Sequence, residues 1–335
     1  MKMDIDFESY IRGSEPDKKE KASAWKTAIG LQAVDGLQTS DYLKDMAVKH
    51  IEGNISIDEV KKLINGYYQS KTVRTPKDEE TEEADKVSAN IARILNEQSF
   101  AFSVAGFTSI HRRLFEGIFK FAGKIRNYDI TKKEWVLRGD TVLYVNSEDL
   151  RRALEYDLEQ EKDFSYKGLS MDDVASHIAK FVSGIWLIHP FGEGNTRSTA
   201  VFTIKYLHSI GFDVNNDLFA DNSWYFRNAL VRANYRNVRK KIEPDMSFLI
   251  LFFRNLMMGG ENGAFPPTLH GLIHPLLDSK GYKTAIKNGS YPFIFAKIAE
   301  NCLKKTEHSR SLVSKMGVLV QKMRPKRSIS VHSQD

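Results

Sequence analysis

The sequence has a single cysteine, Cys302, among its 335 residues. A lone cysteine excludes an internal disulfide framework and a cysteine-rich zinc site. The apolar runs, such as SFLILFF, are far shorter than the roughly 20 residues that a membrane-spanning helix needs. The opening segment MKMDIDFESYIRG is acidic and polar and lacks the apolar centre of a secretory signal. These absences predict a protein of the reducing cytoplasm that does not bind a membrane.

The chain also lacks a concentrated basic surface. Its net charge is +6 and its pI is near 9.1, but the excess is spread over a long chain, with much of it in the tail KMRPKRSISVHSQD. No basic strip is interleaved with aromatic residues, so we do not expect nucleic acid as a partner. The charge balance favours anionic ligands in general, nucleotides included.

Strand patterns are scarce, and no alternation of strands and helices indicates a parallel sheet. The segment KEWVLRGDTVLYV is the exception, because apolar residues flank a turn at Gly139 and Asp140, which is the pattern of a β-hairpin. Most other segments show apolar residues at helical spacing. We therefore predict a mainly α fold with one strand pair.

Three short helices are predicted near the N-terminus, in residues 23–72. Ser40 and Ser56 stand where helix caps are expected, and Gly36 and Gly53 stand where helices end. This pattern indicates a small three-helix module.

Composition divides the rest of the chain. The charged, proline-containing segment that follows the module indicates a linker, and the apolar helical patterns that follow it indicate a larger core. The predicted parts are an N-terminal arm (1–22), the three-helix module (23–72), a linker (73–86), a helical core (87–258) and a C-terminal helical extension with a basic tail (259–335).

The segment LIHPFGEGNTRSTA carries the chemistry. An apolar helix predicted over 171–188 ends at His189, because Pro190 disfavours helical backbone in the residue before it. Gly192 and Gly194 allow backbone N–H groups to turn toward one point and form an anion nest. A new helix then begins, and its N-terminus favours a phosphate, which Arg197 is placed to bind as well.

Glu193 is the one acid in this cationic surrounding. It would repel a polyphosphate unless Mg²⁺ bridged the two. Its position four residues after His189 also fits a helical zinc pair, but the proline and glycines around it disfavour that helix. A base, a metal ligand, a phosphate nest and an arginine are together the parts of a phosphoryl-type transfer site.

The run HPFGEGNTR resembles the signature of the Fic/Fido family, histidine-x-phenylalanine-x-acid-glycine-asparagine-x-arginine. Three other segments are similar to the family as well, over roughly the middle half of the chain: IHRRLFEGIFKFAGKIR, KEWVLRGDTVLYV and WYFRNALVRANY.

This resemblance implies a Fic-type helical bundle that transfers AMP from ATP to a hydroxyl group, with Mg²⁺, and releases pyrophosphate. The acceptor would be an unknown protein target or the protein itself. His189 would be the general base and Glu193 the Mg²⁺ ligand. Gly194 and Asn195 would line the α-phosphate site, and Arg197 would meet the outer phosphates.

The resemblance also assigns residues around this centre. The remaining nucleotide-binding candidates are Phe191, which would brace the loop, with Gly192, Thr196, Tyr225, Phe226 and Asn234. The hairpin would be a flap that aligns the target segment by strand pairing, and its residues are Trp135, Val136, Leu137, Gly139, Asp140 and Thr141.

The sequence departs from the family pattern at two positions. Thr196 replaces the usual glycine or lysine, and Ala200 stands where many members carry a second arginine. Arg227 and Arg232, on the neighbouring predicted helix, are candidates to replace that arginine, and both are equally consistent with a solvated surface.

The three-helix module resembles the small antitoxins that pair with Fic toxins, in which a glutamate blocks the γ-phosphate site by pairing with an arginine. Asp35, followed by Gly36, fits the order of helices and turns in those antitoxins, whereas Glu52 belongs to a later turn. Asp35 is therefore the inhibitory candidate, and a module that merely packs or dimerises is the alternative.

Other readings of the same residues stay open at this point. A Fic fold also suits phosphate, UMP or phosphocholine transfer, or removal of AMP. A non-catalytic nucleotide-binding regulator is a further alternative, and a homo-oligomer is compatible with the sequence.

Overall fold

The structure is a computed structural model, and it describes residues 7–13, 15–137, 139–212 and 217–258. Within these ranges it is mainly helical, as predicted, and no helix there is long and apolar enough to span a membrane. The helices are α1 (Phe7–Gly13), α2 (Pro16–Gly30), η1 (Leu31–Asp35, 3₁₀), α3 (Asp41–Ile51), α4 (Ile57–Gln69), α5 (Pro76–Asn96), α6 (Val104–Phe115), η2 (Trp135–Leu137, 3₁₀), α7 (Leu150–Lys162), α8 (Met171–Ile188), α9 (Asn195–Ser209), α10 (Asp217–Asn234) and α11 (Ser247–Met258). The predicted C-terminal extension, 259–335, lies outside the described residues.

The helix ends of the N-terminal module follow the capping residues that the sequence indicated. The Ser40 side chain accepts a hydrogen bond from the backbone N–H of Leu43 at the start of α3. Ser56 and Glu59 form a reciprocal capping box at the start of α4. Gly53 follows α3 with φ +79°, a left-handed conformation that glycine adopts without strain.

The segment predicted as an N-terminal arm (1–22) is mostly helical in its described part. Helix α1 occupies Phe7–Gly13, and α2 begins at Pro16, well before Ser23. Proline suits the first helical turn, and Ala22 and Trp25 are fully buried.

In the segment predicted as a linker (73–86), helix α5 already begins at Pro76, so most of the segment is helical. Thr75 and Asp78 form a capping box at its start. Asp85 is fully buried and accepts hydrogen bonds from the Tyr68 hydroxyl at 2.6 Å and from the backbone N–H of Ser40 at 2.8 Å. Caps and buried hydrogen bonds therefore hold a charged segment in a helix whose sequence indicated a loop.

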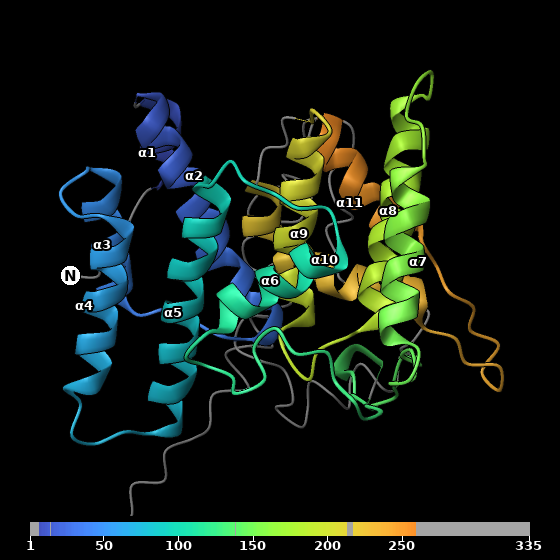
Figure 1. The fold of residues 1–335 in the computed structure, drawn as a ribbon, viewed down its shortest axis with the longest axis horizontal. Helices are drawn as coiled ribbons and strands as arrows, with labels where there is room; N and C mark the ends of the chain where they lie inside the picture. Colours follow the sequence, from blue (N-terminus) through green and yellow to red (C-terminus); the bar gives the residue numbers. More distant parts are fainter. Residues whose placement is uncertain (1–6, 14, 138, 213–216, 259–335) are drawn as a thin grey trace, which may run out of the picture. The chain divides into compact units, whose positions relative to one another are not determined.

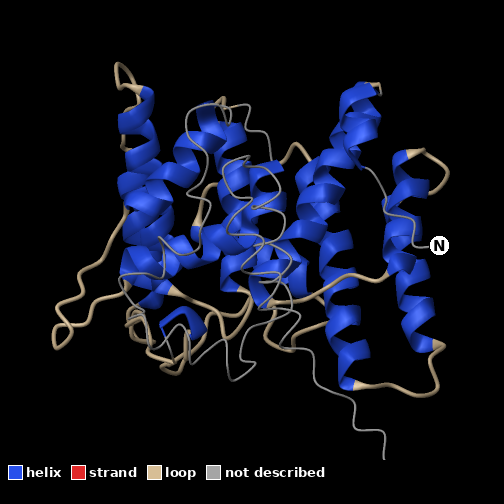
Figure 2. Ribbon diagram, turned by 180° about the vertical axis from the view of Figure 1, so that it is seen from behind, coloured by secondary structure: helices blue, strands red, loops and turns tan. Residues whose placement is uncertain are grey.

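The core of the described unit surrounds α9, in which every residue from Asn195 to Leu207 is buried. Helices α5, α6 and α8 pack against α9, and α2 packs between α5 and α10, as the ribbon shows (Figure 1). The reverse view shows α3 and α4 outside α5, away from α9 (Figure 2). The module therefore contacts the core through α2, η1 and α4.

No β-strand occurs in the described residues, so the predicted hairpin is not formed as strands. An isolated antiparallel bridge joins Glu134 and Asp140, and the 3₁₀ helix η2 lies between them. Side chains hold this turn: Val136 and Leu137 are buried, and Asp140 accepts a hydrogen bond from the Tyr235 hydroxyl at 2.6 Å. The turn therefore needs no ladder of backbone hydrogen bonds.

Candidate active site

His189 ends helix α8 in a left-handed conformation, with φ 51° and ψ 56°. Such a backbone costs a residue other than glycine roughly 1–2 kcal/mol, so the surrounding structure must hold it. Arg126 does so, because its Nε donates to the His189 carbonyl at 2.9 Å and its backbone N–H donates to the Pro190 carbonyl at the same distance. Arg126 is buried and was not singled out from the sequence.

The imidazole of His189 has one nitrogen engaged and one free. Its Nδ1 lies 3.2 Å from the Trp186 carbonyl, which only accepts, so Nδ1 carries the proton and Nε2 keeps a lone pair. Nε2 is buried and has no hydrogen-bond partner among the described residues. Burial, and then the charge of Lys132, lower the pKa of His189 well below 6.5. The ring is therefore a neutral proton acceptor at neutral pH.

The loop after His189 is fixed by its own side chains. Asn195 grips Phe191, since its Oδ1 accepts from the Phe191 N–H at 3.0 Å and its Nδ2 donates to the Phe191 carbonyl at 2.8 Å. The Phe191 ring is fully buried and stacks on His111 at 3.7 Å between centroids. His111 accepts from the Gly123 N–H and donates to the Glu193 carbonyl. Burial lowers the pKa of His111 to about 4, so it stays neutral.

Gly194 begins helix α9 with φ +76°. A Cβ atom there would lie 2.3 Å from the Phe115 ring, and at Gly192 it would lie 2.7 Å from the Tyr128 hydroxyl. Gly194 is thus required by its positive φ and by close approach to a buried ring, whereas the Tyr128 side chain beside Gly192 is exposed and free to move. Thr196, in the first turn of α9, accepts a hydrogen bond from Trp186 at 3.0 Å. The N-terminus of α9 lies next to His189, where it favours an anion.

Arg197 is buried and surrounded by acceptors from two distant parts of the chain. Asp35 lies 2.8 Å from its Nε, out of line with the N–H, so the contact is an ion pair. The Nη1 donates to Gln32 at 3.1 Å and the Nη2 donates to Glu83 at 2.7 Å. The guanidinium also lies 4.8 Å from the Phe115 ring centroid. Asp35 and Gln32 belong to η1 of the module, whereas Glu83 belongs to α5.

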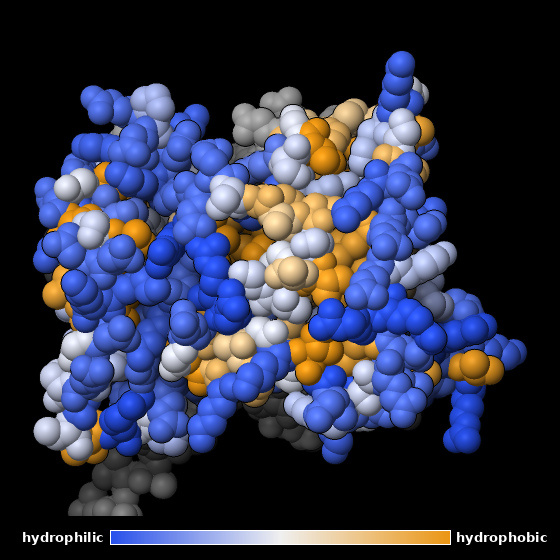
Figure 3. Space-filling model, viewed as in Figure 1, coloured by the Kyte–Doolittle hydropathy of each residue, from blue (hydrophilic) through white to orange (hydrophobic). Residues whose placement is uncertain are grey.

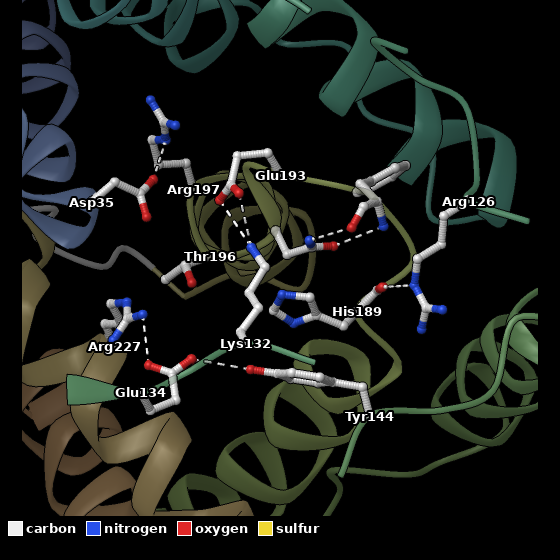
Figure 4. Close-up of polar contacts among 12 residues, drawn as sticks. Asp35, Arg126, Lys132, Glu134, Tyr144, His189, Glu193, Thr196, Arg197 and Arg227 are labelled. Atoms are coloured by element: carbon white, nitrogen blue, oxygen red, sulfur yellow. Dashed lines mark hydrogen bonds and ion pairs between the residues drawn. The ribbon is translucent and has the colours of Figure 1, made fainter. Parts of the chain in front are cut away.

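Two further ion pairs cross the site (Figure 4). The Nζ of Lys132 lies 2.9 and 3.0 Å from the two carboxylate oxygens of Glu193. Arg227 donates to Glu134 at 2.7 Å, and the Tyr144 hydroxyl donates to the other oxygen of Glu134 at 3.2 Å. The basic groups of the site are thus already neutralised by carboxylates.

These groups enclose a cavity of about 30 Å³. It is lined by Asp35, Lys132, Glu134, Trp186, His189, Glu193, Asn195, Thr196 and Arg227. This is about the volume of one water molecule, whereas small-molecule sites measure roughly 300–1,000 Å³. A nucleotide therefore enters only after some of these side chains have moved.

The fit to Mg²⁺ depends on Glu193. The described residues contain no cluster of three or more metal-binding side chains. Mg²⁺ in nucleotide sites commonly uses one or two carboxylates together with phosphate oxygens, so a single carboxylate beside a phosphate nest fits that mode. Lys132 would have to release Glu193 first.

The structure brings most of the predicted site residues together. One cavity is lined by Asp35, His189, Glu193, Asn195 and Thr196. The loop between α8 and α9 contains Phe191, Gly192 and Gly194, and Arg197 follows it in α9. In the turn that contains Gly139 and Thr141, Asp140 bonds to the chain segment after α10. Sequence reasoning missed Lys132, Glu83, Gln32, Arg126 and His111.

The predicted nucleoside contacts do not join this group, because none of them lines the cavity. Phe226 is fully buried and packs on Phe219 and Phe252. The Tyr225 hydroxyl donates to the carbonyl of Phe248, and Asn234 donates to Ser183 at 2.9 Å. These side chains serve the core among α8, α10 and α11, so their placement does not support the predicted role.

Arg232, one of the two proposed substitutes for a second arginine, is engaged elsewhere. Its Nη1 donates to the Glu243 carbonyl at 2.7 Å. Arg227 alone of the two lines the cavity.

Residues 101–207 match the model of the Fic/DOC family, so the chain contains a Fic/DOC family domain. Three solved structures are similar to this chain. The N-terminal FIC domain of the Bep8 effector from Bartonella sp. 1-1C is 18% identical, with a TM-score of 0.45 over 58% of this chain and 91% of that one. The Fic domain of a putative cell filamentation protein from Bartonella quintana, with bound ADP, is 18% identical, with a TM-score of 0.44 over 55% and 87%. BepC from Bartonella tribocorum, with bound AMPPNP, is 20% identical, with a TM-score of 0.41 over 55% and 88%.

Proposed function

We propose that this chain is a protein adenylyltransferase, which transfers AMP from ATP to a hydroxyl group of a protein target or of itself. The observation that carries the proposal is the free, buried Nε2 of His189, which lies beside the N-terminus of α9. A proton acceptor next to a phosphate-binding helix end is the arrangement that nucleotidyl transfer to a hydroxyl requires. The Fic/DOC domain over residues 101–207 supports the same reaction class.

In the proposed reaction, the acceptor hydroxyl oxygen attacks the α-phosphorus of ATP. Its O–H bond breaks and the proton passes to Nε2 of His189, while the bond from the α-phosphorus to the bridging oxygen breaks and pyrophosphate leaves. The hydrogen bond from Nδ1 to Trp186 keeps Nε2 as the accepting atom. Arg126 holds the histidine backbone, so the ring points into the cavity throughout (Figure 4).

The phosphates would be held by the start of α9 and by the basic side chains around it. Gly194 and Thr196 would present backbone N–H groups, and Arg197 would bind the outer phosphates. Glu193 would hold Mg²⁺, which when bound neutralises phosphate charge. Of the basic residues at the site, Arg227 is the candidate to supply the contact that Ala200 does not make.

The target would dock along the turn from Trp135 to Thr141. Its backbone groups, rather than its side chains, would pair with the target segment. Asp140 would keep the turn in place through its hydrogen bonds to Tyr235 and Asn237.

The N-terminal module would act as a built-in inhibitor. Asp35 neutralises Arg197 and lines the cavity where a nucleotide would enter. Glu83 adds a second carboxylate from the core side of the same guanidinium. A nucleotide would therefore compete with Asp35 for Arg197.

The test is incubation of the protein with α-labelled ATP and Mg²⁺, followed by location of any adduct by mass spectrometry. His189→Ala should lower incorporation by at least about a hundredfold, and His208→Ala, which removes an exposed histidine of α9, should not. Parallel incubations with UTP and CDP-choline test the other donors. Undiminished AMP transfer by His189→Ala would reject the mechanism.

A further inference from the structure

A second, larger cavity lies between α4 and α5, outside the site described above. Its volume is about 260 Å³, close to the lower end of small-molecule sites. The two helices run side by side in both ribbon views (Figures 1 and 2). The cavity is lined by Lys61, Ile64 and Asn65 of α4, by Lys86, Ala89 and Asn90 of α5, and by Glu116 and Gly117 after α6.

The lining combines an apolar floor with polar walls. Ile64 and Ala89 are buried. The Nδ2 of Asn90 donates to the Leu114 carbonyl at 3.0 Å, which fixes the amide at the wall. The surface over this part of the molecule is largely hydrophilic, in contrast to the apolar area over α8 and α9 (Figure 3). A ligand of this cavity would therefore meet both polar and apolar groups.

The charged side chains of the lining indicate whether the ligand would be an anion or a cation. Two lysines face one carboxylate, that of Glu116. Lys86 has a partner in Glu82, at 2.6 Å. No hydrogen bond or ion pair is formed by Lys61 within the described ranges. Burial, and then the charge of Arg93, lower the pKa of Lys61, whereas the nearby carboxylates of Asp58 and Glu116 raise it without a hydrogen bond to its ammonium group.

We propose that this cavity binds a small anion that carries a phosphate or carboxylate group. The anionic group would lie between Lys61 and Lys86 and form charge-assisted hydrogen bonds with both. The amides of Asn65 and Asn90 would bind the polar remainder of the ligand. The site joins a helix of the module to α5, which also carries Glu83, so a bound anion fixes these two helices to one another.

Binding is measured by calorimetry on the full chain with inorganic phosphate, with citrate as the carboxylate probe and with glycerol as the neutral control. Lys61→Met keeps the side-chain stem and removes the charge, and it should weaken anion binding at least tenfold. Lys62→Met, at an exposed neighbour that does not line the cavity, should not change binding. Equal affinity in the two variants, or no anion binding to wild type, overturns the proposal.

A second measurement needs no variant. The anion that binds should protect Lys61 of the wild-type protein from acetylation by an activated ester, whereas labelling of Lys62 stays constant. Equal labelling of Lys61 with and without the anions overturns the proposal. Both measurements are independent of AMP transfer, so their outcome does not depend on the proposed reaction.

Discussion

Replacing Asp35 by alanine should open the nucleotide site, because Asp35 is the module residue that lines the cavity. A nucleotide that binds Arg197 must first displace the Asp35 carboxylate, which lies 2.8 Å from Nε. Hydrogen bonds to charged groups contribute about 1.5–3 kcal/mol, and this range is the upper bound for an ion pair such as this one. The Asp35 side chain is 25% exposed, and solvent screens such a pair, so the lower end of about 1.5–2 kcal/mol applies. At about 1.4 kcal/mol per factor of ten, ATP should bind roughly 10- to 30-fold more tightly.

The assay combines calorimetric ATP binding with the rate of AMP incorporation from α-labelled ATP. Asp45→Ala, which removes an exposed acid from α3, is the matched control and should leave both quantities unchanged. Glu83 and Gln32 still hold Arg197 in the Asp35→Ala variant, so Asp35→Ala/Glu83→Gln should bind ATP more tightly again. Equal ATP affinity for wild type and Asp35→Ala would refute the reasoning.

Three further predictions concern other parts of the structure. Lys132→Met frees Glu193, so Mn²⁺ should bind the ADP complex about tenfold more tightly, which electron paramagnetic resonance measures. Unchanged affinity would contradict a competition between lysine and metal. Burial keeps the pKa of His189 well below 6.5, so its neutral form persists on acidification. The single-turnover rate should therefore stay flat from about pH 8 to 6.5 and fall only at lower pH. A midpoint at the ordinary histidine value would show that the ring is not buried during turnover. Asp85→Ala should lower the free energy of unfolding in urea by about 2–4 kcal/mol, since it leaves buried donors without an acceptor. Tyr68→Phe removes one of those donors and should lower the same quantity by about 1 kcal/mol. A larger loss for the tyrosine variant would contradict a main contribution from Asp85.

The arrangement around the loop could be predicted from sequence because it is local. His189 and Arg197 belong to one helix–loop–helix run, in which Pro190 ends one helix and Gly194 starts the next. Caps are local as well, and both Ser40 and Ser56 cap helices as predicted. Spacing along the chain is sufficient to predict such features.

The failures have physical causes that spacing does not reveal. Lys132 and Glu83 reach the site only through tertiary contacts across many residues of chain, and nothing in the sequence around them indicates the partner. Phe226 has the helical spacing of both a nucleoside contact and a core residue, and its burial gives the predicted nucleoside contact no support. The hairpin pattern failed because backbone pairing is limited to the single bridge between Glu134 and Asp140, and side-chain contacts such as that of Glu134 with Arg227 hold the rest of the turn.

In the proposed inhibition, Ala200 determines which arginine the module pairs with. It is fully buried in α9, one turn beyond Arg197, so no second guanidinium stands at that position for an acid of the module to pair with. Asp35 instead meets Arg197, the residue that the proposed function assigns to the outer phosphates. Under this proposal one guanidinium would serve both Asp35 and the nucleotide, and the two would compete directly. Glu83 of α5 also pairs with this guanidinium. If the module withdrew, Arg197 would therefore keep a carboxylate partner, and its buried charge would stay compensated until a phosphate bound.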